Sequence, residues 1–256
     1  MDTKQPSMPT YPKIQTLFKR HLEGPKKGKL IKGQWTTPAL EYLSRNQWEF
    51  TEKVDGTNIR IGFDYRRLRH VANPSFGGRT ENAVIPKHLL EMLEDWFHYD
   101  LFMDNDLRER VTLFGEGYGD KIQNGGKYFD KVRHLKDEPT RFTGFVLFDV
   151  KIGEFWLERE NVNDIAKKLG IESVPVIGQG TLYDAIDIVE SGLTWDSHGK
   201  MTNWGGTIGN NKRRFAGLKS NWGDFEAEGI VARPMTPLTD RKGDRIITKI
   251  KGVDFK

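Results

Sequence analysis

The sequence predicts an α+β fold built from antiparallel sheets with helices between the strands. Apolar and polar residues alternate in residues 48–53 and again in 58–63, which is typical of half-buried strands. Between residues 86 and 98, the apolar side chains instead fall on one helical face. Neither an internal repeat nor a clear interdomain linker divides the 256 residues, so we expect a single domain over residues 1–256.

The other elements follow from the same patterns in chain order. Gly56 separates the first two strands, which we expect to form a hairpin, and residues 11–20 predict a short helix or an anchoring segment. Further strands are predicted for residues 111–114, 142–150, 154–157, 228–233 and 245–251, and short helices for 161–169 and 182–189. Residues 191–224 contain seven glycines and the basic run 212–214, and a connection of this length is usually functional or mobile.

Charge is spread unevenly along the chain. Lys and Arg total 40 against 36 Asp and Glu, a net charge of +4. Residues 1–33 alone hold eight basic and two acidic side chains, so this arm carries +6. A basic arm suits a polyanionic partner, and it is equally typical of a solvated tail.

Several classes of protein are excluded by composition. Cysteine is absent, which excludes disulfides, a thiolate nucleophile and cysteine-ligated zinc or iron–sulfur centres. No apolar run approaches the roughly 18 residues of a membrane span, and the first residues hold no apolar signal segment. With 11% aromatic and 30% charged residues, the composition predicts a soluble globular protein without a membrane partner, and a cytoplasmic location is the default expectation.

Lys53-Val54-Asp55-Gly56 is the first candidate for chemistry. Lys53 ends a predicted strand, and Gly56 then turns the chain. A partly desolvated lysine close to other cations loses its proton more readily and becomes a nucleophile. A surface lysine followed by an ordinary Asp-Gly turn explains these residues as well, so the tetrapeptide alone does not decide between them.

Further candidates follow in an ordered series along the chain. They are Arg79 in a Gly-Gly-Arg-Thr run, Glu116 and Phe148 near strand ends, Glu228 at a strand start, and Lys249 with Lys251 on the last strand. Residues two apart on a strand share a face, so the two lysines are expected to point the same way. Taken singly, each candidate has a simpler explanation. Phe148 is explained as a core ring, Glu116 and Glu228 as carboxylates at hairpin ends, and Lys249 and Lys251 as a solvated strand face. Together the series indicates an ATP site, because it supplies a nucleophile, cations for phosphates, carboxylates for a ribose and a metal, and a ring for the purine.

This ordered series resembles the covalent nucleotidyltransferase superfamily of DNA ligases, RNA ligases and mRNA capping enzymes. Within it, the chain is most similar to the ATP-dependent RNA ligases of the phage type. The motifs span about residues 48–251 and are Glu52-Lys53-Val54-Asp55-Gly56-Thr57-Asn58, Phe114-Gly115-Glu116, Phe148-Asp149-Val150, Glu228-Gly229-Ile230-Val231 and Lys249-Ile250-Lys251. The Thr-Asn extension and the Phe-Gly-Glu triplet favour RNA ligases. The resemblance implies a ligase-type nucleotidyltransferase fold, with antiparallel sheets flanked by helices around an ATP cleft.

The resemblance also implies a reaction in three steps. Lys53 attacks the α-phosphate of ATP, AMP passes from the lysine to the 5′-phosphate of a strand, and a 3′-hydroxyl then displaces AMP. The resemblance implies that Lys249 and Lys251 contact the α-phosphate. It also implies that Glu228 and Asp55 bind the metal, Mg2+ or Mn2+. The remaining implied nucleotide contacts are Glu52, Asn58, Arg79, Glu116 at the ribose, Phe148 on adenine, and Arg233.

Two departures from the family pattern keep a DNA ligase that seals duplex nicks open as the alternative. Asp55 occupies a position that is often His in the closest RNA ligases, and Arg233 stands where they often carry Lys. The expected partner is therefore RNA or a nicked duplex with 5′-phosphate and 3′-hydroxyl ends. A capping enzyme that uses GTP fits less well. The second alternative, a non-catalytic nucleic-acid-binding protein, requires a lost catalytic residue, whereas the implied ones are present.

The last motif ends five residues before residue 256, so we expect no OB-fold or helical domain after it. Many relatives use such a domain to clamp the nucleic acid. Three explanations stay open: the chain is a minimal ligase, it is part of a longer protein, or the basic arm, about residues 1–33, and residues 191–224 serve as clamps. The sequence carries no expectation for the oligomeric state.

Overall fold

The computed structural model describes residues 8–65, 73–123, 128, 143–191, 193–195, 201–203, 218–223 and 225–255, with the backbone alone for 193–195 and 201–203. The basic run 212–214 and the first residues of the basic arm lie outside the described residues. In the described part of the chain, no helix is long and apolar enough to cross a membrane.

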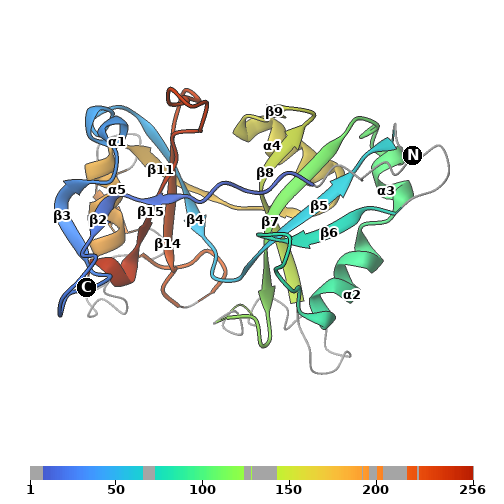
Figure 1. Cartoon of the computed structure of the whole chain (residues 1–256), viewed down its shortest axis with the longest axis horizontal. Coiled ribbons are helices and arrows are strands. Elements are labelled where there is room, and N and C mark those ends of the chain that lie inside the picture. Colours follow the sequence, from blue (N-terminus) through green and yellow to red (C-terminus); the bar gives the residue numbers. More distant parts are fainter. Residues whose placement is uncertain are drawn as a thin grey trace. The chain divides into compact units, whose positions relative to one another are not determined.

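Short strands and helices alternate along the described chain (Figure 1). The strands are β1 (Gln15–Thr16), β2 (Phe18–Arg20), β3 (Leu30–Trp35), β4 (Trp48–Lys53), β5 (Thr57–Phe63), β6 (Ser75–Gly78), β7 (Val111–Gly119), β8 (Thr143–Ile152), β9 (Phe155–Trp156), β10 (Glu172–Ser173), β11 (Val176–Gly180), β12 (Leu193–Trp195), β13 (Met201–Asn203), β14 (Gly229–Pro234) and β15 (Thr248–Lys251). The helices are α1 (Pro38–Tyr42), α2 (Lys87–Trp96), α3 (Tyr99–Asp104), α4 (Arg159–Lys168), α5 (Leu182–Ser191) and the 3-10 helix η3 (Gly252–Asp254).

The chain divides into two compact units. The first unit comprises Met1–Pro12 and Asp55–Val174, and the second comprises Lys13–Val54 and Pro175–Lys256. One boundary falls inside the Lys-Val-Asp-Gly motif, so Lys53 belongs to the second unit and the aspartate that follows Val54 belongs to the first. The single nucleotidyltransferase domain stays a prediction.

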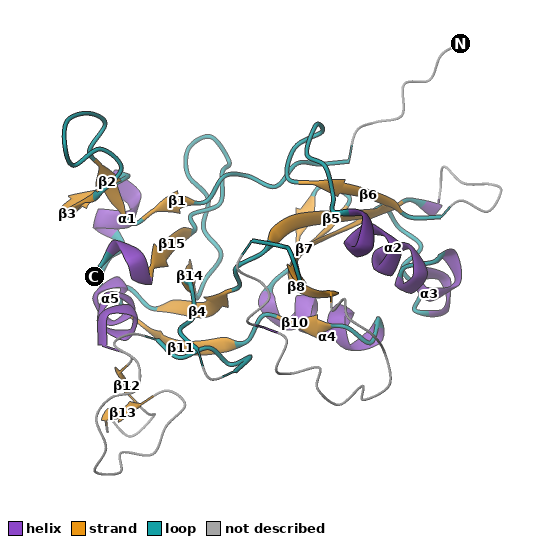
Figure 2. Cartoon of the chain, turned by 90° about the horizontal axis from the view of Figure 1, so that it is seen from below, coloured by secondary structure: helices purple, strands orange, loops and turns teal. Residues whose placement is uncertain are grey.

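The second unit is built on a sheet with the strand order β1-β15-β14-β4-β11 (Figure 2). β14 lies between β15 and β4 and is antiparallel to both, while β1 joins the edge parallel to β15. Trp48, Phe50, Ile230 and Ile250 are buried on one face of this sheet, in a cluster that includes side chains of α5. Because successive side chains alternate between faces, Lys53 points to the opposite face.

The first unit is built on a sheet with the order β10-β8-β7-β5-β6 (Figure 2). β9 pairs with β8. Ile59, Ile61, Leu113 and Leu147 are fully buried on one face, in a cluster with side chains of α2 and α4. The alternate residues of β5 and β7 therefore lie on the other face, which we call the polar face of the first unit.

The predicted α+β fold with antiparallel sheets is confirmed, but the predicted hairpin of residues 48–53 and 58–63 is wrong. β4 pairs with β14 and β11, whereas β5 pairs with β6 and β7. Two consecutive strands thus join different sheets, because pairing with distant strands outweighs the local Asp-Gly turn signal.

Two further local predictions differ from the structure. Residues 11–20 contain β1 and β2 and no helix, because their backbone pairs with β15 and β3. β7 continues through Gly115 and Gly117 to Gly119, beyond the predicted strand of residues 111–114. A Cβ on Gly115 would lie 2.2 Å from Cζ of Phe145, so glycine here permits close packing within a strand instead of ending it.

Candidate active site

Lys53, Glu228 and Lys251 form an ion cluster on the second unit. Lys53 Nζ lies 2.5 Å from Glu228 Oε2, and Lys251 Nζ lies 2.5 Å from Glu228 Oε1. The side chains are 22%, 14% and 31% exposed, in that order. One carboxylate is thus held between two lysines in a partly buried place, where solvent screens charge less than at an open surface.

The register of three strands brings this cluster together. Gly229 pairs with Lys53 on β4 and with Lys251 on β15, and Glu228, directly before it, contacts both lysines. Gly229 has φ +155°, and a Cβ there would lie 2.0 Å from the carbonyl oxygen of Ile250. Only glycine therefore permits this approach of β14 to β15 beside Glu228.

Glu228 remains ionised to lower pH than an ordinary glutamate. Burial by itself raises the pKa of Glu228, but the charge of Lys53 and hydrogen bonds from Lys251 and Lys53 outweigh burial and lower this pKa below its ordinary value of 4.5. At neutral pH the side chain is therefore a carboxylate, which can hold both lysines in place through charge-assisted hydrogen bonds.

Other predicted residues share the face of Lys53. Arg233 Nη1 donates a hydrogen bond to Thr51 Oγ1 at 3.4 Å, and Thr51 alternates with the core residues of β4 as Lys53 does. Lys249 and Lys251 line one pocket, as their spacing of two residues predicts. This face of the second unit therefore collects the basic side chains.

Glu52 lies on the opposite face of β4 and is 1% exposed. Its Oε1 accepts a hydrogen bond from Ser220 Oγ at 2.5 Å, and its Oε2 accepts one from the backbone N–H of Asn221 at 2.8 Å. The carboxylate thus anchors residues 218–223 to the strand that carries Lys53. The nucleotide contact expected of Glu52 stays a prediction.

Asn58 and Glu116 lie on the polar face of the first unit. They are directly opposite each other on β5 and β7, in register with the neighbouring core pair of Ile59 and Gly115. Asn58 Oδ1 is buried and has no hydrogen-bond partner among the described residues. A buried acceptor without a donor costs about 1–3 kcal/mol, so a ligand hydroxyl is a fitting partner for it.

A β-bulge in β8 places Phe148 on the same polar face. Phe114 of β7 pairs with Asp149 and the next residue pairs with Leu147, so Phe148 has no residue opposite it. Leu147 and Val150 stay in the core, and Phe148 and Asp149 between them both turn to the polar face. The bulge therefore presents a half-buried ring that an uninterrupted strand would not place beside Asp149.

Asp55 and Arg79 are the remaining predicted residues of the first unit. The backbone N–H of Asp55 donates to the hydroxyl of Tyr128 at 2.8 Å. A Cβ on Gly56 would lie 2.3 Å from the carbonyl oxygen of Gly117, so this glycine is needed for a close approach to β7. Arg79 is exposed directly after β6.

Tyr11 is a functional candidate that sequence reasoning missed. Its hydroxyl donates to Asp149 Oδ2 at 2.5 Å, and its ring meets the ring of Phe148 edge-on with 5.0 Å between centroids. Arg60, which is 1% exposed, holds the same N-terminal segment by donating to the carbonyl of Met8 at 2.8 Å. Because 138 residues separate Tyr11 from Asp149, no local pattern could have signalled this contact.

Comparison with known proteins decides the family. A family model described as RNA ligase matches residues 46–251. The chain belongs to the RNA ligase family. No curated protein matches it by sequence.

Solved structures of an RNA ligase from Naegleria gruberi have a similar fold. A mutant of that ligase with AMP and Mn shows a TM-score of 0.51 and 14% identity, covering 84% of this chain and 52% of the ligase. A second mutant, with ATP and Mn, shows a TM-score of 0.51 and 14% identity over 94% of this chain and 61% of the ligase. This chain therefore spans little more than half the length of those structures. The predicted ligase-type nucleotidyltransferase fold is confirmed, and the phage type stays a prediction.

Proposed function

We propose that this chain is an ATP-dependent RNA ligase that joins a 5′-phosphate to a 3′-hydroxyl through a lysyl-AMP intermediate. The observation that carries the proposal is the cluster in which Glu228 holds both Lys53 and Lys251 at 2.5 Å. Membership of the RNA ligase family supports RNA as the substrate. The N. gruberi ligase structures with AMP or ATP and Mn support ATP as a reactant and a divalent ion as a cofactor.

Lys53 is the proposed nucleophile of the first step. Its Nζ loses a proton to solvent and forms a bond to the α-phosphorus of ATP, and the bond from that phosphorus to pyrophosphate breaks. Glu228 orients Lys53, and Lys251 neutralises charge on the α-phosphate together with Lys249. In such transfers, catalysis comes almost entirely from positioning and charge neutralisation, and the cluster provides both.

The first unit is the proposed holder of the nucleoside. The ring of Phe148 stacks on adenine, and Glu116 and Asn58 bind ribose hydroxyls. The buried, unpartnered Oδ1 of Asn58 supports this assignment. Arg79 is the proposed contact for the 5′-phosphate of the strand, which then takes AMP from the lysine before a 3′-hydroxyl displaces AMP.

Glu228 and Asp55 are the proposed carboxylates for Mg2+ or Mn2+. An ionised carboxylate offers about four lone-pair sites, so Glu228 can accept a cation beside its two lysines. Magnesium at phosphate-transfer sites is commonly bound through one or two carboxylates together with substrate phosphates. When bound, the ion neutralises phosphate charge that develops during transfer.

Incubation with α-labelled ATP and magnesium tests the proposal. We expect a labelled, acid-labile AMP adduct on the wild-type chain and none on Lys53→Arg, which keeps a cation beside Glu228 but removes the amine nucleophile. Failure of the wild-type chain to form an adduct would refute the ligase and favour a non-catalytic nucleic-acid-binding protein. An adduct formed from GTP instead of ATP would indicate a capping enzyme.

The substrate class is tested by sealing assays on matched RNA, DNA and hybrid nicks. We expect sealing of RNA ends to be fastest, because a protein distinguishes RNA from DNA through the 2′-hydroxyl. Faster sealing of duplex DNA nicks would establish the DNA ligase that Asp55 leaves as the alternative.

A further inference from the structure

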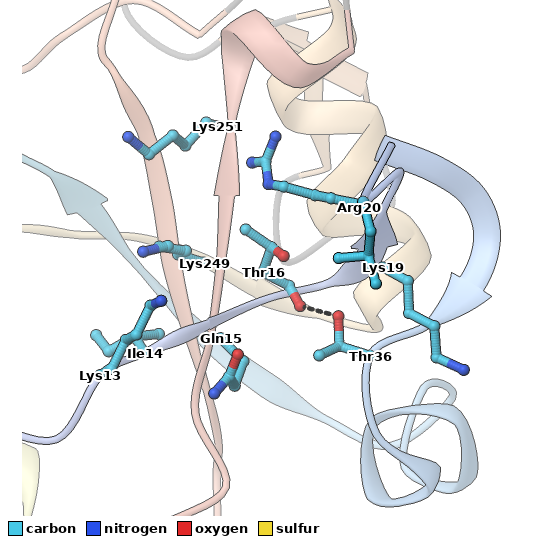
Figure 3. A pocket seen from close by; sticks show the side chains of 10 residues that line it. Lys13, Ile14, Gln15, Thr16, Lys19, Arg20, Thr36, Lys249 and Lys251 are labelled. Atoms are coloured by element: carbon cyan, nitrogen blue, oxygen red, sulfur yellow. Dashed lines mark hydrogen bonds between the residues drawn. The ribbon is translucent and has the colours of Figure 1, made fainter. Parts of the chain in front are cut away.

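A basic pocket lies at the β1 edge of the sheet in the second unit. Its volume is about 580 Å³, and five of the ten residues that line it are cationic. These are Lys13, Lys19, Arg20, Lys249 and Lys251, and none of the described lining residues is acidic. Figure 3 shows the amine ends of Lys13, Lys249 and Lys251 turned to the same side of the pocket.

The N-terminal wall of this pocket is fixed to the strand that carries the two C-terminal lysines. β1 runs parallel to β15 with Thr16 opposite Lys249, and the N–H of Leu17 donates to the carbonyl of Lys249 at 3.3 Å. Thr36 Oγ1 donates to the carbonyl of Thr16 at 2.5 Å on the other side (Figure 3). The backbones of the two walls therefore keep a set spacing.

The cations of this pocket differ in how far their charge is balanced. Arg20 makes two hydrogen bonds to the carboxylate of Asp254, at 2.9 and 2.6 Å, so its charge is largely paired. Lys251 shares Glu228 with Lys53. Lys13 is exposed and forms no ion pair with any of the described acidic residues. The pocket thus carries surplus positive charge at Lys13, which suits a bound anion.

The strand order gives the position of the pocket relative to the strand that carries Lys53. Moving away from β4, the sheet presents β14, then β15 with Lys249 and Lys251, and then β1. Strands lie about 4.8 Å apart, so β15 is about 10 Å and β1 about 14 Å from the strand of the nucleophile. Lys53 is not among the described residues that line the pocket, whereas Lys251 is.

Displacement at phosphorus places the nucleophile and the leaving group roughly in line, on opposite sides of the phosphorus. An α-phosphate held by Lys249 and Lys251 and attacked by Lys53 from the side of β4 would carry its pyrophosphate group on the side of β1. The basic pocket lies on this β1 side of the sheet. It has room for two phosphates, since ligand pockets generally measure about 300–1,000 Å³.

We propose that the pocket lined by Lys13, Lys249 and Lys251 binds the β- and γ-phosphates of ATP and releases them as pyrophosphate. This inference rests on the proposed function, and it gives the basic N-terminal arm a role in the first step in addition to any contact with nucleic acid. As the bond between α-phosphorus and the bridging oxygen breaks, its electron pair goes to pyrophosphate. The ammonium group of Lys13 offsets the charge that this leaving group gains.

The decisive variant is Lys13→Ala, with Lys27→Ala as the matched control. Both are exposed lysines of the basic arm, but Lys27 does not line the pocket. We expect Lys13→Ala to raise the KM for ATP in lysine adenylylation by about tenfold. The concentration of inorganic pyrophosphate that inhibits adenylylation should rise by about the same factor. A loss of this size is typical when a hydrogen bond to a charged group is removed. The affinity for AMP, which lacks both phosphates, should not change, and Lys13→Arg should restore most of the lost affinity.

Sealing of a strand that already carries a 5′-adenylate provides the second readout, because this step uses neither ATP nor pyrophosphate. We expect Lys13→Ala to leave its rate unchanged. A loss in this step with normal adenylylation would overturn the inference and show that Lys13 clamps the nucleic acid. An unchanged KM for ATP and unchanged inhibition by pyrophosphate would also overturn the inference, but not the proposed ligase activity. A wild-type chain that forms no AMP adduct would refute the proposed function itself.

Discussion

The polar faces of the two sheets hold their functional groups by different means. On the second unit, charged groups hold one another, since Glu228 binds both Lys53 and Lys251 at 2.5 Å. On the first unit, Phe148 is held by a neighbouring ring, that of Tyr11. Charge-assisted pairs suit phosphate chemistry, because they are strong and resist displacement by the charge of the substrate. Ring contacts suit a purine, whose recognition depends on shape and stacking.

The two faces also arise from different backbone devices. On the second unit, strand register places Gly229 between two lysines, and this glycine, with φ +155°, permits the close approach of β14 to β15 beside Glu228. The first unit instead needs an irregularity, because Phe148 reaches the polar face only through the bulge in β8. We therefore expect substitutions that remove a charge to impair the function of the second unit most. Substitutions that remove a ring should impair nucleotide binding by the first unit most.

Removal of the negative charge of Glu228 should have the largest effect. Glu228→Gln keeps the shape of the side chain but weakens its hold on Lys53 and Lys251, so we expect lysine adenylylation at saturating ATP to slow by about a hundredfold, as misplacement of a reacting group typically does. The rate is measured with α-labelled ATP. Glu41→Gln, on the exposed surface of α1, is the control and should leave the rate unchanged. A normal rate for Glu228→Gln would show that charge does not organise this face.

Removal of the ring of Phe148 should have a smaller effect, confined to binding. Loss of a stacked base contact costs about 1–3 kcal/mol, so we expect Phe148→Ala to weaken AMP binding by about tenfold or more. Inhibition by pyrophosphate, which has no base, should not change. Phe155→Ala is the matched control, since Phe155 is 77% exposed on the neighbouring β9. Equal losses of affinity for AMP and for pyrophosphate would contradict the assignment of the base to the ring of Phe148 and of the phosphates to the charged residues.

Removal of the Tyr11 hydroxyl should act through stability more than through chemistry. Tyr11→Phe keeps the ring beside Phe148 but leaves the buried carboxylate of Asp149 without this donor, which costs about 1–3 kcal/mol in the free energy of unfolding. Denaturant titration measures the cost, with Tyr42→Phe on the exposed surface as the control. Binding of AMP should weaken only a few-fold. A loss of AMP binding as large as that of Phe148→Ala would assign the hydroxyl a direct role at the nucleotide.

The same contrast explains how much of the molecule could be predicted from the sequence. Alternation of apolar and polar residues locates β4, β5, β14 and β15, and the order of the motifs selects Lys53 and Glu228. Alternation shows which residues share a face, but it does not show which strand lies beside which. The hairpin prediction failed for this reason, since the Asp-Gly turn carries no information about distant partners.

The first unit was harder to predict than the second. On the second unit, the spacing of Lys249 and Lys251 was a sufficient guide to their common face. On the first unit, the bulge at Phe148 and the contact of Tyr11 with Asp149 depend on packing between segments that are distant in sequence. Packing of this kind leaves no periodic pattern, so a single sequence does not reveal it.

The acid stability of the Glu228 cluster gives the smallest expected effect and the most direct test of its electrostatics. Because Lys53 and Lys251 lower the pKa of Glu228 despite its burial, the unfolded chain takes up a proton at about 4.5 while the folded chain still resists it. The stabilising contribution is therefore complete above 4.5 and is lost as the pH falls through the lowered pKa.

We expect Glu228→Gln to be less stable than the wild-type chain at about pH 7, and the difference to shrink as the pH falls toward about 3. Denaturant titrations across this range measure the free energy of unfolding of both chains. The exposed control Glu41→Gln should follow the wild-type curve throughout. A difference that stayed constant with pH would mean that the cluster is held by hydrogen-bond geometry alone, and the contrast between a charge-held and a shape-held face would then fail.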